Sequence, residues 1–205
     1  MKYNNKFNGS SIVEAMVIML IIVSWVTWMY NIYSESIQLS VWITNKIQAI
    51  QIAKQGIEWM TNIRDTNWIL FSSDYTNCWN VLNYNTSCIW DTTTNNDIEN
   101  NSQYIIYNDT DNRWVLDKKT TNLFWSWSYI TDFKVWLKDW IYTQSWITDD
   151  LKVKFTRELD ISYTWAFSNS NDPKMQIKSI VQWVDNTSTR VRKVEMTQLL
   201  TNWKK

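Results

Sequence analysis

The 205-residue chain contains no histidine. This absence removes the commonest general base, the Ser-His and Cys-His nucleophile pairs and the usual zinc sites, which two cysteines alone cannot complete. Charge is balanced, with 20 basic and 20 acidic residues and no long basic run, so no overall field steers the protein towards nucleic acid. We therefore expect a protein that is not an enzyme, has no specific nucleic-acid partner and needs no cofactor.

Glycine is scarce as well. Ordinary proteins contain about 7% glycine, or roughly 14 residues in this length, whereas this chain has 2 glycines beside 16 tryptophans. Four tryptophans occupy polar, turn-like settings where glycine is usual, because glycine takes positive φ without steric cost: Trp125, Trp127, Trp140 and Trp146. We hypothesise that they are glycines encoded by a reassigned UGA codon, an idea that UGG at all four would exclude. Three others lie in apolar settings typical of genuine tryptophan: Trp68, Trp183 and Trp203.

A short basic leader, residues 1–9, precedes an uninterrupted apolar run over residues 15–30, with Glu14 at its start. An ionisable group in a membrane segment costs a few kcal/mol or more and persists mainly where it has a partner. Cleavage between Gly9 and Ser10 would create one, because the new α-amino group would lie about one helical turn from the carboxylate, in the same or a neighbouring chain. An uncut chain has no such charge at this place.

These residues resemble the N-terminal signal of type IV pilins and pseudopilins: glycine ending the leader, an apolar stretch after it, and glutamate at the fifth mature position, Glu14. The family usually has phenylalanine as its first mature residue, where this chain has Ser10. The resemblance implies cleavage by a prepilin peptidase, methylation of the new N-terminus, and polymerisation through the N-terminal helix into a pilus or a secretion-like pseudopilus. The implied partners are other pilin subunits, the peptidase, an inner-membrane assembly platform and, before assembly, membrane lipid.

Two other interpretations of the apolar run compete with this one. Secretory signals have short apolar cores that end at a small-residue cleavage site, whereas this run continues through Trp25, Trp28 and Tyr30 into more helix. The stronger alternative is a monomeric, single-pass membrane-anchored binding domain outside the cytoplasm. Lys2 and Lys6 favour a cytoplasmic leader and an exported C-terminal part. The pilin interpretation therefore places the precursor in the cytoplasmic membrane with its head outside, and the mature chain in an extracellular pilus or a periplasmic or cell-wall pseudopilus.

Past the membrane segment, expected at about residues 12–33, apolar residues recur at three- and four-residue steps: Ile43, Ile47, Ile50, Ile57, Met60 and Ile63. One helix over residues 10–66 is therefore predicted as a stem, half transmembrane and half amphipathic. Its lower part, residues 56–65, resembles the junction of stem and head in pilin-like proteins of small-genome bacteria.

The remainder, residues 67–205, is predicted to form a β-rich head, so the fold class is α+β: a long N-terminal helix packed on an antiparallel sheet, as in pilins. Alternating apolar residues begin a strand at 151–155, and two hairpins are expected, one around the turn at 108–112 and one around 185–188. The segment 90–103 lacks an apolar period and is expected to be an exposed loop.

Two features of the head are candidate sites. Cys78 and Cys88 are separated by nine residues and, in an exported domain, most often form a loop-closing disulfide; reduced thiols are the alternative. Asp109, Asp111 and Asp117 are spaced so that they could supply oxygens to calcium, although the pattern lacks the glycine and terminal glutamate of an EF-hand loop. Capping of a turn is the other interpretation of these aspartates.

Overall fold

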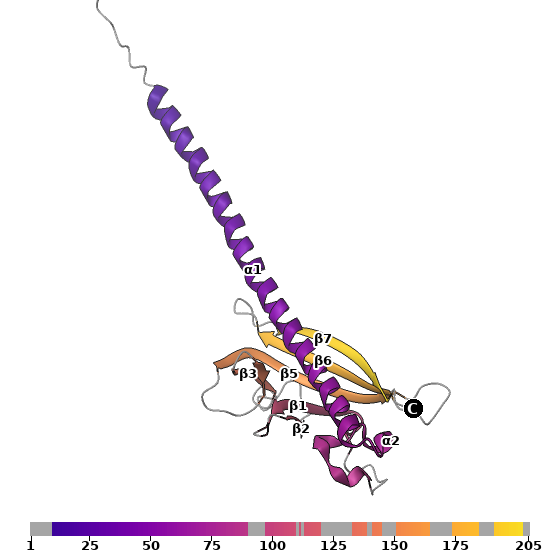
Figure 1. Cartoon of the computed structure of the whole chain (residues 1–205). Helices are drawn as coiled ribbons and strands as arrows, with labels where there is room; N and C mark the ends of the chain where they lie inside the picture. Colours follow the sequence, from indigo (N-terminus) through magenta and orange to yellow (C-terminus); the bar gives the residue numbers. More distant parts are fainter. Residues whose placement is uncertain are drawn as a thin grey trace, which may run out of the picture. The chain divides into compact units, whose positions relative to one another are not determined.

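The computed structural model describes residues 10–89, 97–109, 111, 113–119, 133–138, 141–144, 151–164, 174–184 and 191–202. Its helices are α1 (Ser10–Leu70), α2 (Tyr75–Cys78) and the short 3-10 helices η1 (Leu82–Tyr84) and η2 (Thr86–Ile89). Its strands are β1 (Ser102–Asn108), β2 (Trp114–Lys119), β3 (Lys134–Lys138), β4 (Ile141–Thr143), β5 (Leu151–Thr164), β6 (Lys174–Val184) and β7 (Val191–Thr201). Figure 1 shows one long helix and a sheet, which confirms the predicted α+β class.

The chain divides into two compact units, residues 1–45 and 46–205. In the first unit the described residues are the N-terminal part of α1. The second unit holds the rest of α1 and all seven strands. Helix α1 continues to Leu70, four residues beyond the predicted boundary at 66, because Asn67 and Trp68 still pack inside the head at 0% and 2% exposure.

The seven strands form one antiparallel sheet with β5 at its centre. Strand β6 pairs with β5 along one side and with β7 along the other. On its opposite side β5 pairs first with β3 and then with β1, and these two strands carry β4 and β2 on their outer sides. Both predicted hairpins, β1–β2 and β6–β7, are confirmed.

The second unit buries one face of α1 against the sheet in two clusters of side chains. The first joins helix residues to β3, β5 and β6 and includes Ala49, Ile52, Ala53, Val135, Phe155, Val181 and Trp183. The second lies further along the helix and includes Met60, Ile63, Trp68, Tyr104, Leu159 and Ile177. Of the residues in the predicted stem period, Ile57, Met60 and Ile63 are buried and mark the face that packs on the head. The earlier members, Ile43, Ile47 and Ile50, are exposed.

Gly56 lies at a close approach of α1 to the sheet. A Cβ at this position would meet Ser179 Oγ at 3.1 Å, Arg157 Cδ at 3.2 Å and Leu159 Cδ2 at 3.2 Å. Arg157, Leu159 and Ser179 are fully buried, so they have little room to withdraw. Glycine at this helical position thus permits the close contact of α1 with β5 and β6.

The predicted exposed loop at 90–103 is wrong at Ile98 and at its end, whereas residues 99–101 are exposed as predicted. Ile98 is 2% exposed and belongs to the second core cluster, and its N–H donates to Asn80 O at 2.9 Å. Ser102 already lies in β1 and is 8% exposed. A single apolar residue among polar neighbours produces no period, so its burial leaves no signal in the sequence. Residues 90–96 lie outside the described part of the chain.

Candidate assembly surface on the N-terminal helix

The predicted processing site lies at the start of α1. Gly9 is outside the described residues, and Ser10 is the first residue of the helix. Glu14 follows one helical turn later, and its side chain is exposed among exposed apolar neighbours such as Val13 and Met16. An α-amino group at Ser10 would be about 6 Å along the helix axis from the backbone of Glu14. A salt bridge with this amine, in the same chain or a neighbouring one, is within side-chain reach.

From Ile12 onwards the helix presents apolar side chains on all sides. It is the one helix in the described part of the chain that is long and apolar enough to cross a membrane by length and composition. The exposed large residues of its first half include Met19, Leu20, Ile21, Ile22, Val23, Trp25, Val26, Trp28 and Met29, each more than half exposed. A helix that is apolar all round needs lipid or protein around it.

The apolar surface continues as a narrower stripe, which we call the stem stripe: Leu39, Ile43, Ile47 and Ile50. These residues recur at four-, four- and three-residue steps and therefore share one face of the helix. Their exposures are 55%, 43%, 51% and 39%. The neighbouring residues Ala49, Ile52 and Ala53 are buried instead in the cluster with the sheet. The stem stripe is thus a second apolar face, separate from the one that the head covers.

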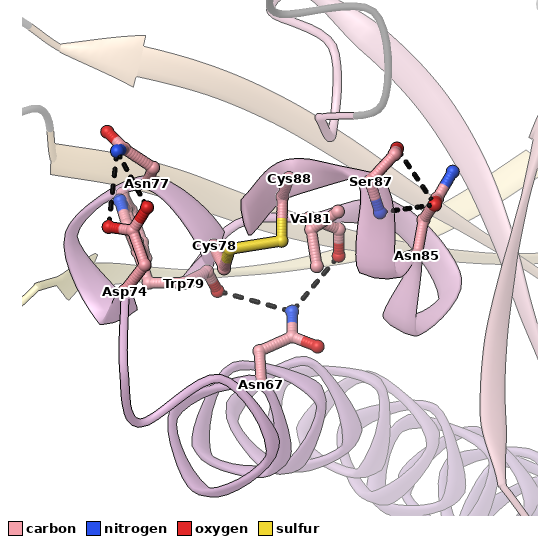
Figure 2. Close-up of a disulfide and its surroundings, with 9 residues drawn as sticks. All are labelled: Asn67, Asp74, Asn77, Cys78, Trp79, Val81, Asn85, Ser87 and Cys88. Carbon is pink, nitrogen blue, oxygen red and sulfur yellow. Dashed lines mark hydrogen bonds between the residues drawn. A yellow bond between two sulfur atoms is a disulfide. The ribbon is translucent and has the colours of Figure 1, made fainter. Parts of the chain in front are cut away.

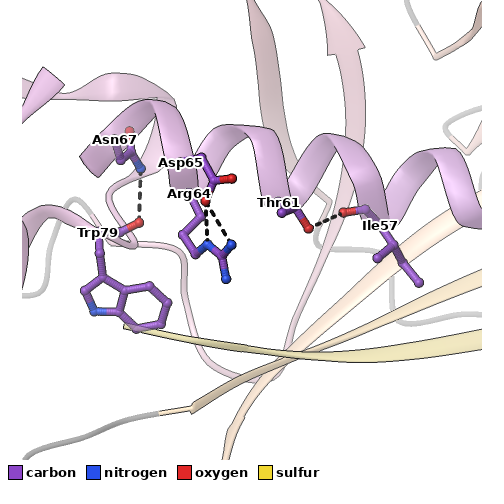
Figure 3. Close-up of polar contacts among 6 residues, drawn as sticks. All are labelled: Ile57, Thr61, Arg64, Asp65, Asn67 and Trp79. Carbon is purple, nitrogen blue, oxygen red and sulfur yellow. Dashed lines mark hydrogen bonds and ion pairs between the residues drawn. The ribbon is translucent and has the colours of Figure 1, made fainter. Parts of the chain in front are cut away.

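Charged residues follow the stem stripe along the helix. Lys54 Nζ lies 3.4 Å from Glu58 Oε1, in an exposed ion pair one turn apart on α1. Further along, Arg64 pairs with Asp65 at 2.8 Å (Figure 3). The Arg64 guanidinium also lies 4.5 Å from the centre of the Trp68 ring. The segment 56–65, noted above for its resemblance to a junction of stem and head, therefore joins a buried apolar face to a polar outer one.

The predicted disulfide between Cys78 and Cys88 is present, and the end of α1 holds its loop (Figure 2). Asn67 is fully buried, and its Nδ2 donates to Trp79 O at 3.3 Å and to Val81 O at 3.0 Å. These two carbonyls lie inside the disulfide loop, so the disulfide closes the loop and the hydrogen bonds of Asn67 tie it to the stem.

Sequence reasoning missed a buried cation in the sheet. Arg157 of β5 is 0% exposed, and its guanidinium donates to Gln144 Oε1 at 3.1–3.2 Å, to Ile106 O at 3.2 Å and to Ile52 O at 3.5 Å. The guanidinium also lies 4.7 Å from the centre of the Trp59 ring. Burial lowers its pKa to about 9, so the group keeps its charge at neutral pH.

Gln144 completes the site at the point where β1 and β3 diverge from β5. Its Nε2 donates to Phe133 O at 3.1 Å and to Arg157 O at 2.6 Å, and its Oε1 accepts from Ile106 N at 3.1 Å. One side-chain amide therefore satisfies the N–H of Ile106 and the C=O of Arg157, and it adds a second donor to Phe133 O, which also accepts from Arg157 N. The cluster stabilises the head, and the interruption of an apolar alternation by Arg157 is its only trace in the sequence.

The three aspartates proposed for calcium lie in and around the β1–β2 hairpin. Asp109 N–H donates to Arg113 O at 2.9 Å, which closes the turn, and Asp117 pairs with Lys119 at 2.8 Å. Within the described ranges, no group of three or more His, Cys, Asp or Glu side chains has a metal-binding arrangement. Calcium therefore stays a sequence-based prediction without a supporting geometry.

The structure describes only some of the tryptophans that the sequence analysis singled out. Trp68 and Trp183, which the sequence marks as genuine, are 2% and 4% exposed in the core. Trp203 and the four candidate glycines, Trp125, Trp127, Trp140 and Trp146, lie outside the described residues.

Comparisons with protein-family models, with curated proteins and with solved structures found no match for this chain. The interpretation of the assembly surface therefore depends on its residues and their exposure.

Proposed function

We propose that this chain is a structural subunit of a type IV pilus or a type II secretion-like pseudopilus. A prepilin peptidase cuts it between Gly9 and Ser10, and the mature chain polymerises through α1. The observation that carries the proposal is the length of the exposed apolar surface, which runs from Ile12 to Ile50.

A membrane covers only part of that surface. About 20 helical residues cross the hydrocarbon core of a bilayer, and residues 12–33 account for them. The stem stripe lies beyond this segment, so a monomeric anchored domain would leave it in water. Its four exposed fractions amount to about two whole aliphatic side chains, whose burial is worth about 3–6 kcal/mol. A second copy of α1 offers a matching apolar surface, and side-by-side packing of stems would bury the stem stripe.

Glu14 would set the position of neighbouring helices relative to one another along their axes. A lone carboxylate surrounded by apolar side chains is costly when lipid or protein covers it. The α-amino group that cleavage creates at Ser10 is the nearest cation that this part of the helix could offer. Pairing of Glu14 with the N-terminus of a neighbouring copy would therefore neutralise both charges and fix how far one stem is displaced along the next.

Replacement of Glu14 by Ala tests the proposal. We expect the variant to be exported and folded but absent from sheared or pelleted filaments, because the register contact is lost. Glu58→Ala is the matched control: it removes another exposed carboxylate of α1, one already paired with Lys54 in its own chain, and should assemble normally. Normal incorporation of the Glu14→Ala chain, or a wild-type chain that forms no filament, would favour the anchored monomer.

A further inference from the structure

On the outer edge of β2, the side away from β1, the strand backbone is hydrogen-bonded by a side chain. In an antiparallel strand the N–H and C=O of one residue point to the same side, and the side alternates from residue to residue. In the described part of the sheet β2 pairs with β1 alone. At Leu116 both groups point away from β1: the N–H donates to Asn83 Oδ1 at 2.9 Å, and the C=O accepts from Asn83 Nδ2 at 2.9 Å. The side-chain amide of Asn83 thus replaces a residue of a neighbouring strand.

A second side chain from the same loop extends this contact. Tyr84 Oη donates to Trp114 O at 3.0 Å, two residues before Leu116 and on the same edge. Asn83 and Tyr84 both have left-handed backbones, with φ of 51° and 59°. Such backbones are uncommon away from glycine and persist where the surroundings hold them. Here the surroundings are a closed loop, since both residues lie between Cys78 and Cys88.

We propose that the Cys78–Cys88 loop is a cap that ends the sheet at β2 and keeps this edge from pairing with a strand of a second copy. An open strand edge presents unpaired N–H and C=O groups and is a template for edge-to-edge association. The disulfide closes the loop, Asn67 ties it to α1 through Trp79 O and Val81 O, and Asn83 pairs with the edge at Leu116. The cap does not depend on the proposed function, because any crowded membrane protein with an open edge meets the same hazard.

The test uses the full chain in detergent micelles and the variant Asn83→Gly, which removes the amide while tolerating the left-handed backbone. Amide exchange at Leu116, followed by mass spectrometry, should become about tenfold faster because one hydrogen bond to its N–H is lost. Sedimentation should show more self-association than in the wild-type chain in the same micelles. Asn85→Gly is the matched control: Asn85 lies in the same loop, but its Oδ1 accepts from Ser87 rather than from β2.

A second variant separates capping from general loss of structure. Asn83→Asp keeps an acceptor for the Leu116 N–H and loses the donor to its C=O, so exchange at Leu116 should stay close to wild type. The proposal is overturned if Asn83→Gly leaves the exchange rate unchanged, if Asn85→Gly accelerates it equally, or if exchange accelerates without any rise in self-association.

Discussion

Gln144 allows the sharpest quantitative test of the head. Its replacement by Ala removes the acceptor of the Ile106 N–H, the donor to Arg157 O and the amide oxygen that faces the guanidinium. Phe133 O keeps the bond from Arg157 N at 2.8 Å and loses less. An unsatisfied buried donor costs about 1–3 kcal/mol, and loss of the partner of a buried charge costs about 3–5 kcal/mol. Since the two costs overlap, we expect the free energy of unfolding to fall by about 3–5 kcal/mol.

Urea unfolding of the full chain in detergent, followed by near-ultraviolet circular dichroism, measures this loss. The control is Gln198→Ala, at an exposed position of β7, which should change the free energy of unfolding by no more than about 0.5 kcal/mol. Joint replacement of Gln144 by Leu and Arg157 by Met should recover only the part of the loss that comes from the unpaired guanidinium, because the buried N–H of Ile106 and C=O of residue 157 still lack the partners that Gln144 supplied. A loss below about 1 kcal/mol in Gln144→Ala would refute the reasoning.

Three further predictions concern other parts of the chain. Gly56→Ala should lower the free energy of unfolding by up to about 2 kcal/mol, since overpacking of about 1–3 kcal/mol exceeds the gain of about 1 kcal/mol in helix propensity; a higher melting temperature would contradict this. Burial raises the pKa of Tyr163, whose hydroxyl donates to Ile98 O. The contribution of the neutral Tyr163 hydroxyl to stability is therefore complete below pH of about 10 and declines above it. Between pH 9 and 11 the melting temperature of Tyr163→Phe should accordingly fall less than that of the wild type. Ile47→Asn should reduce the yield of pelleted filaments and leave the melting temperature unchanged. The control is Ile69→Asn, at an even more exposed position outside the stem stripe, which should leave both the yield and the melting temperature as in the wild type. Equal yields from the two variants would show that the stem stripe has no role.

The parts of the fold that sequence predicts well are those with a clear period. A long apolar run followed by three- and four-residue steps indicates one helix, and α1 is continuous over that range. Short apolar segments on either side of polar turns indicate the hairpins β1–β2 and β6–β7, which are present. Local pattern suffices in these cases because each element buries one face.

The missed features share a different cause. Strand β5 continues to Thr164, well beyond the alternating segment 151–155. The apolar alternation stops at Phe155 because Arg157 occupies the next inward position, where an apolar residue would be expected. Asn83 and Gln144 resemble ordinary loop residues, yet each satisfies the backbone of a strand distant in sequence. Such roles depend on where strands diverge or end, and a single sequence does not contain that information locally.

Mass spectrometry of the N-terminal peptide from native cells tests the central claim most directly. The account predicts a mature chain that begins at Ser10, because only cleavage there supplies the amine for Glu14, and the same spectrum reports whether that amine is methylated. A peptide that begins at Met1 would contradict the account and leave a membrane-anchored surface domain.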